Sequence, residues 1–303
     1  MERILLLLFL ISILLISGCV EQPFEGAITE GIKINEFSPD RSTIYTRDSV
    51  GLNLEVQNVG EVPGTLREVM VYGVDTVSGS TPDPSKWAEG SPVFDLTMDE
   101  ILDPSSPSFD FEGESRSFRW KPKAPTDIKT PTTYDFRVRV KYDYETRYMG
   151  TIRVVKASYL DTLPEDEREN LIKQGGVVSS SVTGGPLSLS VLKGRHFIIY
   201  EGETTQSRPI KFEITNVGSG FPYSGEDIGP DTMYKVNIFA ASGDGFTCPI
   251  GTNIKLSKGE SGIFSCNFNP PASIQSKVDM LISITFDYNY ATDAVTLITV
   301  NPE

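Results

Sequence analysis

Alternating apolar and polar positions dominate the chain from residue 31 onward. The clearest run, residues 50–57, places Val50, Leu52, Leu54 and Val56 on one face. This period of two is typical of half-buried strands in antiparallel sheets. The same pattern predicts further strands at residues 31–37, 66–74, 93–96 and 115–120, followed by a hairpin of 134–142 with 147–155.

The second half of the chain repeats this order. Strands are expected at residues 187–191, 197–200, 209–215, 234–239, 277–289 and 296–300. Asn58-Val59-Gly60 and Asn216-Val217-Gly218 follow equivalent strands, and Tyr142-Asp143-Tyr144 has its counterpart in Phe286-Asp287-Tyr288. Repeated motifs in the same order, with different spacings, indicate two copies of one β-domain.

One helix is expected between the two halves, at residues 163–173. Thr162 and Glu165 have the spacing of a capping box, and Gly175 suits the helix end. We therefore predict an all-β chain of two tandem antiparallel Ig-like β-sandwiches, residues 31–156 and 187–303, joined by a helical and flexible linker at 157–186.

The first nineteen residues have the pattern of a targeting signal. Arg3 precedes an apolar run at residues 4–16, which spans only about 20 Å as a helix and is too short to cross a bilayer core of about 30 Å. The ending Ile16-Ser17-Gly18-Cys19 resembles the lipobox of prokaryotic lipoproteins. This resemblance implies a signal peptide at 1–18, a lipid on Cys19 and a tether at 19–30; the alternative is an uncleaved anchor helix reaching Val20.

A family resemblance also concerns the β-domains. An alternating strand, Asn-x-Gly and a second alternating strand resemble Ig-like domains of the CARDB type, found in bacterial and archaeal surface proteins. The resemblance implies a fold and supplies no function. The use of Ile, Lys and Glu, with the short start of the signal, favours an archaeal source and leaves a bacterial one open.

Charge and cysteine content narrow the chemistry. The chain has 41 acidic and 27 basic residues, a net charge of −14, which argues against nucleic acid as a partner. With Cys19 assigned to the lipid, Cys248 and Cys266 are expected to form a disulfide in an oxidising compartment; two buried free thiols are the alternative.

Catalytic motifs are absent from the sequence: it contains no GxSxG, no HExxH and only one histidine, His196. We expect no enzyme activity and no cofactor. One chemical possibility stays open, a Ca²⁺ site formed by Glu226, Asp227 and Asp231 in a glycine-bearing loop.

Aromatic residues offer binding surfaces instead. The expected contact patch consists of Phe221, Tyr223, Trp87 and Phe109, which lie in loops. Two aromatic rows are interpreted as core packing, with an exposed platform as the alternative: Tyr142, Tyr144 and Tyr148, and Phe286, Tyr288 and Tyr290.

The sequence thus predicts a lipid-anchored protein on the extracytoplasmic face of the cell membrane. Its expected role is structural, adhesive or in assembly with envelope or surface proteins, through two Ig-like modules. A receptor lipoprotein for a carbohydrate or solute is the alternative, and an envelope hydrolase is a third.

Overall fold

The structure is a computed structural model that describes residues 29–77, 85–88, 93–106, 109, 111–174, 176–192, 198–200, 207–270 and 274–303. Residues 1–28, and with them Cys19, lie outside the described residues, as does His196. The described chain is all-β, with several antiparallel sheets and two short helices, so the predicted fold class is confirmed.

The strands follow the order of the chain. Those of the first half are β1 (Ile32–Pro39), β2 (Thr43–Tyr45), β3 (Leu52–Asn58), β4 (Gly64–Tyr72), β5 (Thr76–Val77), β6 (Trp87–Ala88), β7 (Asp95–Leu102), β8 (Ser115–Trp120) and β9 (Thr132–Lys156). Those of the second half are β10 (Val177–Val182), β11 (Leu187–Val191), β12 (Ile198–Tyr200), β13 (Arg208–Asn216), β14 (Phe221–Tyr223), β15 (Lys235–Ser242), β16 (Phe246–Thr247), β17 (Asn253–Lys255), β18 (Ser261–Phe268) and β19 (Lys277–Asn301).

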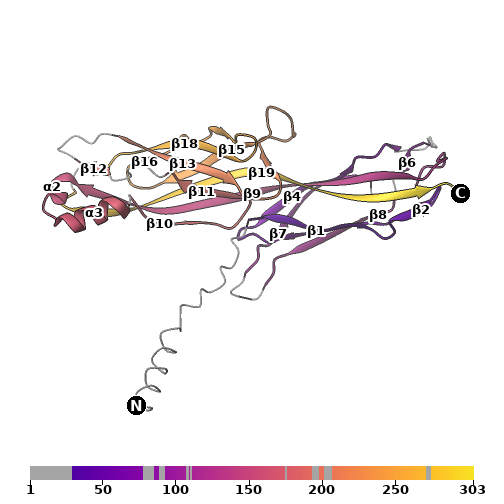
Figure 1. The fold of residues 1–303 in the computed structure, drawn as a ribbon, viewed down its shortest axis with the longest axis horizontal. Helices are drawn as coiled ribbons and strands as arrows, with labels where there is room; N and C mark the ends of the chain where they lie inside the picture. Colours follow the sequence, from indigo (N-terminus) through magenta and orange to yellow (C-terminus); the bar gives the residue numbers. More distant parts are fainter. Residues whose placement is uncertain are drawn as a thin grey trace, which may run out of the picture.

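Two strands, β9 and β19, run through the whole molecule (Figure 1). Each has 25 residues, or roughly 80 Å at about 3.3 Å per residue. They pair antiparallel without a break, from Lys277 opposite Val155 to Val300 opposite Thr132. The expected hairpin of residues 134–142 and 147–155 is therefore wrong, as is the separation of 277–289 from 296–300.

The reason lies in the residues between the expected strands. Residues 143–146 (Asp-Tyr-Glu-Thr) contain no Gly, Pro or Asn to make a tight turn, so the strand continues. Even-numbered residues of β9 face the interior on both sides of this stretch, from Phe136 to Val154. One unbroken alternation indicates one strand.

The first sandwich packs the sheet β1-β3-β8 against β7, β4, the first part of β9 and the last part of β19. β2 completes this second layer by pairing in parallel with β19 at Thr299–Asn301. The second sandwich is built in the same way, from the sheet β11-β13-β18-β16 and from β17, β15, the first part of β19 and the last part of β9. Here β12 pairs in parallel with the end of β9.

Each sandwich thus receives a strand segment from the other half of the chain. The last part of β9 pairs with β10 and β12 in the second sandwich, while the last part of β19 pairs with β2 in the first. Residue numbers 31–156 and 187–303 remain a prediction of domain boundaries, but the sheet formed by β9 and β19 continues across both ranges.

The connector has the expected bounds but is more regular than expected. It contains α2 (Ala157–Leu160) and α3 (Glu165–Gln174), and the run expected to be flexible, residues 175–185, includes β10 on the edge of β9. The Thr162 hydroxyl donates to the carbonyl of Tyr159 at 2.7 Å. Thr162 therefore caps the end of α2. The expected capping box had instead placed it at the start of the following helix.

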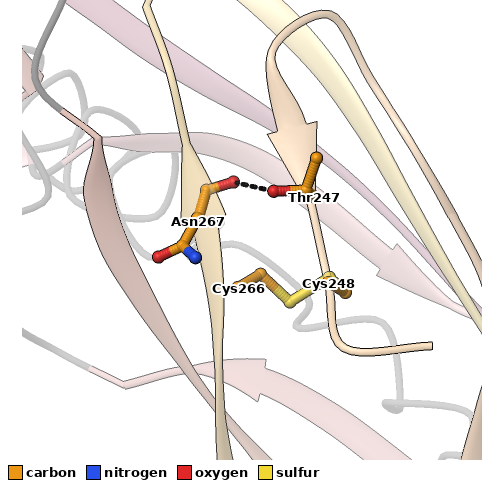
Figure 2. Close-up of a disulfide and its surroundings, with 4 residues drawn as sticks. All are labelled: Thr247, Cys248, Cys266 and Asn267. Carbon is orange, nitrogen blue, oxygen red and sulfur yellow. Dashed lines mark hydrogen bonds between the residues drawn. A yellow bond between two sulfur atoms is a disulfide. The ribbon is translucent and has the colours of Figure 1, made fainter. Parts of the chain in front are cut away.

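Cys248 and Cys266 form the predicted disulfide, with their Cα atoms 4.3 Å apart. Figure 2 shows the bridge beside the paired residues Thr247 of β16 and Asn267 of β18. It therefore joins neighbouring positions of one sheet and does not cross between the two sheets.

Candidate functional site

The two aromatic-Asp-Tyr motifs meet at the middle of the molecule, which we call the waist: residues 142–145 of β9 and 287–290 of β19. Tyr144 lies opposite Tyr288, and Tyr142 lies opposite Tyr290. The ring centroids are 6.3 Å apart in the first pair and 5.5 Å in the second. All four rings are buried, so the interpretation of these rows as core packing is confirmed.

The tyrosine hydroxyls tie the two sandwiches to their turns. Tyr290 donates to Oδ1 of Asn216 at 2.8 Å and accepts from the amide of Gly220 at 3.1 Å. Tyr144 donates to the carbonyl of Gly184 at 3.1 Å. Burial raises the pKa of Tyr144 to about 12, so this phenol stays neutral at ordinary pH.

The asparagines of both Asn-Val-Gly motifs hydrogen-bond to the backbone of the turns at this waist. Nδ2 of Asn58 donates to the carbonyls of Val62 and Leu102, each at 2.9 Å, and Nδ2 of Asn216 donates to Gly220 at 2.9 Å. The amide of Gly60 donates back to Oδ1 of Asn58 at 3.1 Å. The motif therefore stabilises a turn, and the side-chain amide of Asn58 is occupied by backbone hydrogen bonds.

The first described residues, 29 and 30, also lie at the waist. Glu30, which precedes β1, accepts a hydrogen bond from the amide of Ser219 at 2.8 Å. Ser219 follows the second Asn-Val-Gly motif, so Glu30 connects the start of the first sandwich to a turn of the second. The described part of the chain thus begins at the waist and not at one end of the molecule (Figure 1).

The outward face of the waist has a polar hollow of about 180 Å³. Asp143 and Asp287, from the two motifs, line it together with Lys235 and the amides Asn237 and Asn289. Partial burial raises the pKa of Asp287, and the nearby charges of Asp143 and Glu145 raise it further. The hollow is a candidate site for a small polar ligand.

Arginines hold most of the neighbouring carboxylates. Nε of Arg67 donates to Asp143 at 2.6 Å, and the side-chain hydrogen bond to Asp143 is the main cause that raises the pKa of Arg67. Arg139 binds Asp293 through two hydrogen bonds of 2.7 Å. These pairs hold the carboxylates of Asp143 and Asp293 in place on the outward face.

Arg139 also joins the two sandwiches. Its guanidinium lies 5.4 Å from the ring centre of Tyr72, on β4, and 5.5 Å from that of Phe221, on β14. Contacts with two aromatic rings and a carboxylate fix the position of the Arg139 guanidinium between β4 and β14. Sequence reasoning missed this cluster, because its members lie far apart in the chain.

The expected contact patch does not assemble as one surface. Trp87 and Tyr223 are buried, with 1% and 2% of their surface exposed, so neither offers a contact. Trp87 lies on the short strand β6 and not in a loop, and it packs edge-on against Phe136, at 4.8 Å between ring centres. Phe221 is half-buried against Tyr234, and Phe109 alone is largely exposed, at 85%.

The Ca²⁺ candidate finds no support from geometry. The described residues, which include Glu226, Asp227 and Asp231, contain no group of three or more His, Cys, Asp or Glu side chains placed to hold a metal ion. Thr232 closes this loop instead, donating to the carbonyl of Asp227 at 2.6 Å.

Among the described helices, none is long and apolar enough to cross a membrane.

No family model matches the chain, and no curated protein matches it in sequence. Among solved structures it is similar to an Escherichia coli alpha-2-macroglobulin activated by porcine elastase, at 9% identity and a TM-score of 0.14 over 89% of this chain. The chain spans 32% of that protein. A second similar structure is the CupB6 tip adhesin from Pseudomonas aeruginosa, at 8% identity and a TM-score of 0.14, with 90% of this chain and 94% of the adhesin covered.

Proposed function

We propose that the protein is a lipid-anchored surface protein that serves as a rigid, two-module element in the architecture or assembly of the cell envelope. The observation that carries the proposal is the unbroken pairing of β9 with β19 through both sandwiches. It turns two modules into one bar, a form suited to holding partners at a fixed distance and unsuited to closing around a substrate.

The anchor part of the proposal rests on the lipobox-like sequence ending at Cys19. A two-chain lipid on this thiol would hold the protein stably, whereas a single acyl chain binds a membrane only marginally. Because Glu30, the last residue of the expected tether at 19–30, is bound at the waist, the tether would join the bar at its middle and not at one end.

The experiment is to express the full chain with its signal in a prokaryotic host and to analyse the N-terminal peptide by mass spectrometry. We expect an N-terminus at Cys19 that carries a lipid mass, and release of a Cys19→Ser variant into the medium. Ser17→Ala, which keeps a small residue before the cleavage site, is the matched control and should remain anchored. A bare thiol in membrane-bound wild type would contradict the proposal.

A second candidate is a receptor for a small polar ligand, favoured by the hollow that Asp143, Asp287 and Lys235 line. Its volume of about 180 Å³ is below the roughly 300–1,000 Å³ of ordinary ligand pockets. A sugar and amino-acid panel measured by thermal shift tests it: a hit that Lys235→Ala and Asp287→Ala both abolish would place this function first.

A further inference from the structure

The two sandwiches are built alike at the waist, so their equivalent positions can be compared. The hydroxyl of Tyr144 accepts from the amide of Val62, and that of Tyr290 accepts from the amide of Gly220. Val62 and Gly220 each lie four residues beyond the asparagine of an Asn-Val-Gly motif. Tyr144 is therefore the structural counterpart of Tyr290, a shift of two positions from the match between the aromatic-Asp-Tyr motifs.

In the first sandwich, two basic side chains balance the carboxylates of the outward face. Three residues before Tyr144 lies Lys141, whose ammonium donates to Glu68 on the paired strand β4 at 2.8 Å. Arg67, the bulged residue of β4 beside Glu68, donates to Asp143 at 2.6 Å. Each of these two carboxylates thus has a cation of the protein as its partner.

The second sandwich lacks both cations. Asp287 occupies the position equivalent to Lys141 and pairs with Asn237 of β15, while the loop at residues 224–234 replaces the bulged arginine. Among the residues that the structure describes, Asp287 forms no ion pair. Oδ1 of Asn237 is buried and has no hydrogen-bond partner there. A carboxylate without a basic partner therefore lies beside an amide oxygen without a donor.

This arrangement costs the folded protein stability. Partial burial raises the pKa of Asp287, and the negative charges of Asp143 and Glu145 raise it further. A carboxylate perturbed in this way and lining a hollow is typical of a functional site. Lys235 lines the same hollow, and within the described ranges it forms no ion pair either. The hollow thus contains one unpaired negative and one unpaired positive side chain.

We propose that the hollow binds a small zwitterion of the free amino-acid class, with its ammonium group at Asp287 and Asn237 and its carboxylate at Lys235. The ligand's ammonium would take the place that the Lys141 ammonium has in the first sandwich. This inference rests on the receptor function, the second candidate above, and names its ligand class. It does not depend on the lipid anchor.

The dimensions and lining of the hollow narrow the ligand further. A volume of about 180 Å³ suits a small amino acid and is too small for an oligosaccharide. The lining favours a small or polar side chain on the ligand, because it also includes Asp143, Tyr223, Ser224 and Asn289. A metal ion fits less well, since no three His, Cys, Asp or Glu side chains of the described chain are placed together to hold one.

The test is calorimetric titration of the full chain in detergent at pH 7 with glycine, alanine and serine. Ethylammonium and acetate serve as probes that carry only one of the two charges. We expect saturable binding of at least one amino acid, about tenfold or more tighter than either single-charge probe, because each charge of the ligand has its own partner.

Variants assign the two charges to their residues. Asp287→Asn and Lys235→Met should each weaken amino-acid binding about tenfold or more. Asp287→Asn removes an unpaired charge, so the ligand-free variant should be at least as stable as wild type, which separates lost binding from lost folding. Asp231→Asn, on the same loop but outside the lining, is the matched control and should bind like wild type.

Three results would overturn the proposal. Equal binding by ethylammonium or a sugar, abolished by Asp287→Asn, would keep the receptor function and reject the zwitterion. No amino-acid binding, together with a lower melting temperature of ligand-free Lys235→Met, would mean that Lys235 itself neutralises Asp287. Wild-type affinity in Asp287→Asn would place the ligand elsewhere. None of these results bears on Cys19, so failure here is distinct from failure of the membrane anchor.

Discussion

At the scale of single residues, the waist is governed by close approaches around buried hydroxyls. A Cβ added at Gly60 would lie 1.8 Å from the hydroxyl of Tyr144 and 2.8 Å from its Cζ, so this buried ring would have to move. Glycine in the Asn-Val-Gly motif is thus required for space and not for its backbone freedom. The sequence indicated a turn here, but the tyrosine that demands the glycine lies over eighty residues away.

We therefore expect Gly60→Ala to destabilise the protein by about 2–4 kcal/mol, because the overlap displaces a buried ring and its hydrogen bonds. Gly229→Ala is the matched control: the nearest atom to its added Cβ is 3.8 Å away, so the cost should stay within about 0.5 kcal/mol. Denaturant titration of both variants measures the difference, and equal stabilities would refute the role given to Gly60.

Two of the four buried tyrosines of the waist, Tyr290 and Tyr142, provide a second comparison. Tyr290→Phe removes the hydroxyl that donates to Oδ1 of Asn216 and accepts from the amide of Gly220, and should cost about 1–3 kcal/mol. Tyr142 has a buried hydroxyl with no hydrogen-bond partner among the described residues, so Tyr142→Phe should cost far less. Thermal unfolding of the two variants decides it, and a larger loss for Tyr142→Phe would count against this account.

Two aspartates on the outward face should respond to pH in opposite directions. A hydrogen bond from Arg153 lowers the pKa of Asp279, so its stabilising effect is present above about pH 3.9, the unfolded value, and is lost as pH falls. Burial raises the pKa of Asp287 in the folded protein. Its carboxyl therefore costs the folded state nothing while it is protonated, at low pH, and destabilises the folded state as pH rises and the group must ionise.

Melting temperatures at pH 3 and pH 7 check these signs. Asp279→Asn should lower the melting temperature at pH 7 and change it little at pH 3. Asp287→Asn should raise it at pH 7, with a smaller effect at pH 3. A destabilised Asp287→Asn variant at pH 7 would show that the carboxylate is needed in its charged form.

At the scale of elements, alternation in the sequence located most strands but not their partners. Residues 115–120 are β8 as expected, and the run at 50–57 overlaps β3 closely. The two long strands were divided wrongly, although no Gly or Pro interrupts residues 132–149 or 277–301. That lack of breakers was the available signal. Which sandwich receives each strand end depends on long-range pairing, and local pattern does not encode it.

The disulfide is an element-scale staple of the second sandwich. It closes the loop between β16 and β18, and a loop of this length contributes about 3 kcal/mol. We expect a Cys248→Ala, Cys266→Ala double variant to lose roughly that much in urea titration, with faster amide exchange in β16 and β18. Wild-type stability in the double variant would mean that the bridge is dispensable to the fold.

At the scale of the molecule, shared strands should make the two sandwiches unfold together. An ordinary pair of tandem modules melts in two steps when their stabilities differ. Here β9 and β19 each lie in both cores, so losing one sandwich removes a strand from the other. Calorimetry should give one transition, and Val138→Ala, in the first core, should shift that transition as a whole. Two resolved transitions would contradict this coupling.

The central claim is that the last part of β19 lies in the first sandwich, paired with the first part of β9. The most direct test is a cross-link that only this pairing permits. Arg137 lies opposite Val295 in the first sandwich, and the outward amides of odd-numbered β19 residues make this a non-hydrogen-bonded pair with Cα atoms about 4.5 Å apart. In a Cys19→Ser background, we expect Arg137→Cys with Val295→Cys to oxidise to a bond between residues 137 and 295, found by peptide mapping. Two free thiols at these positions, in folded protein, would show that the end of β19 stays within the second sandwich.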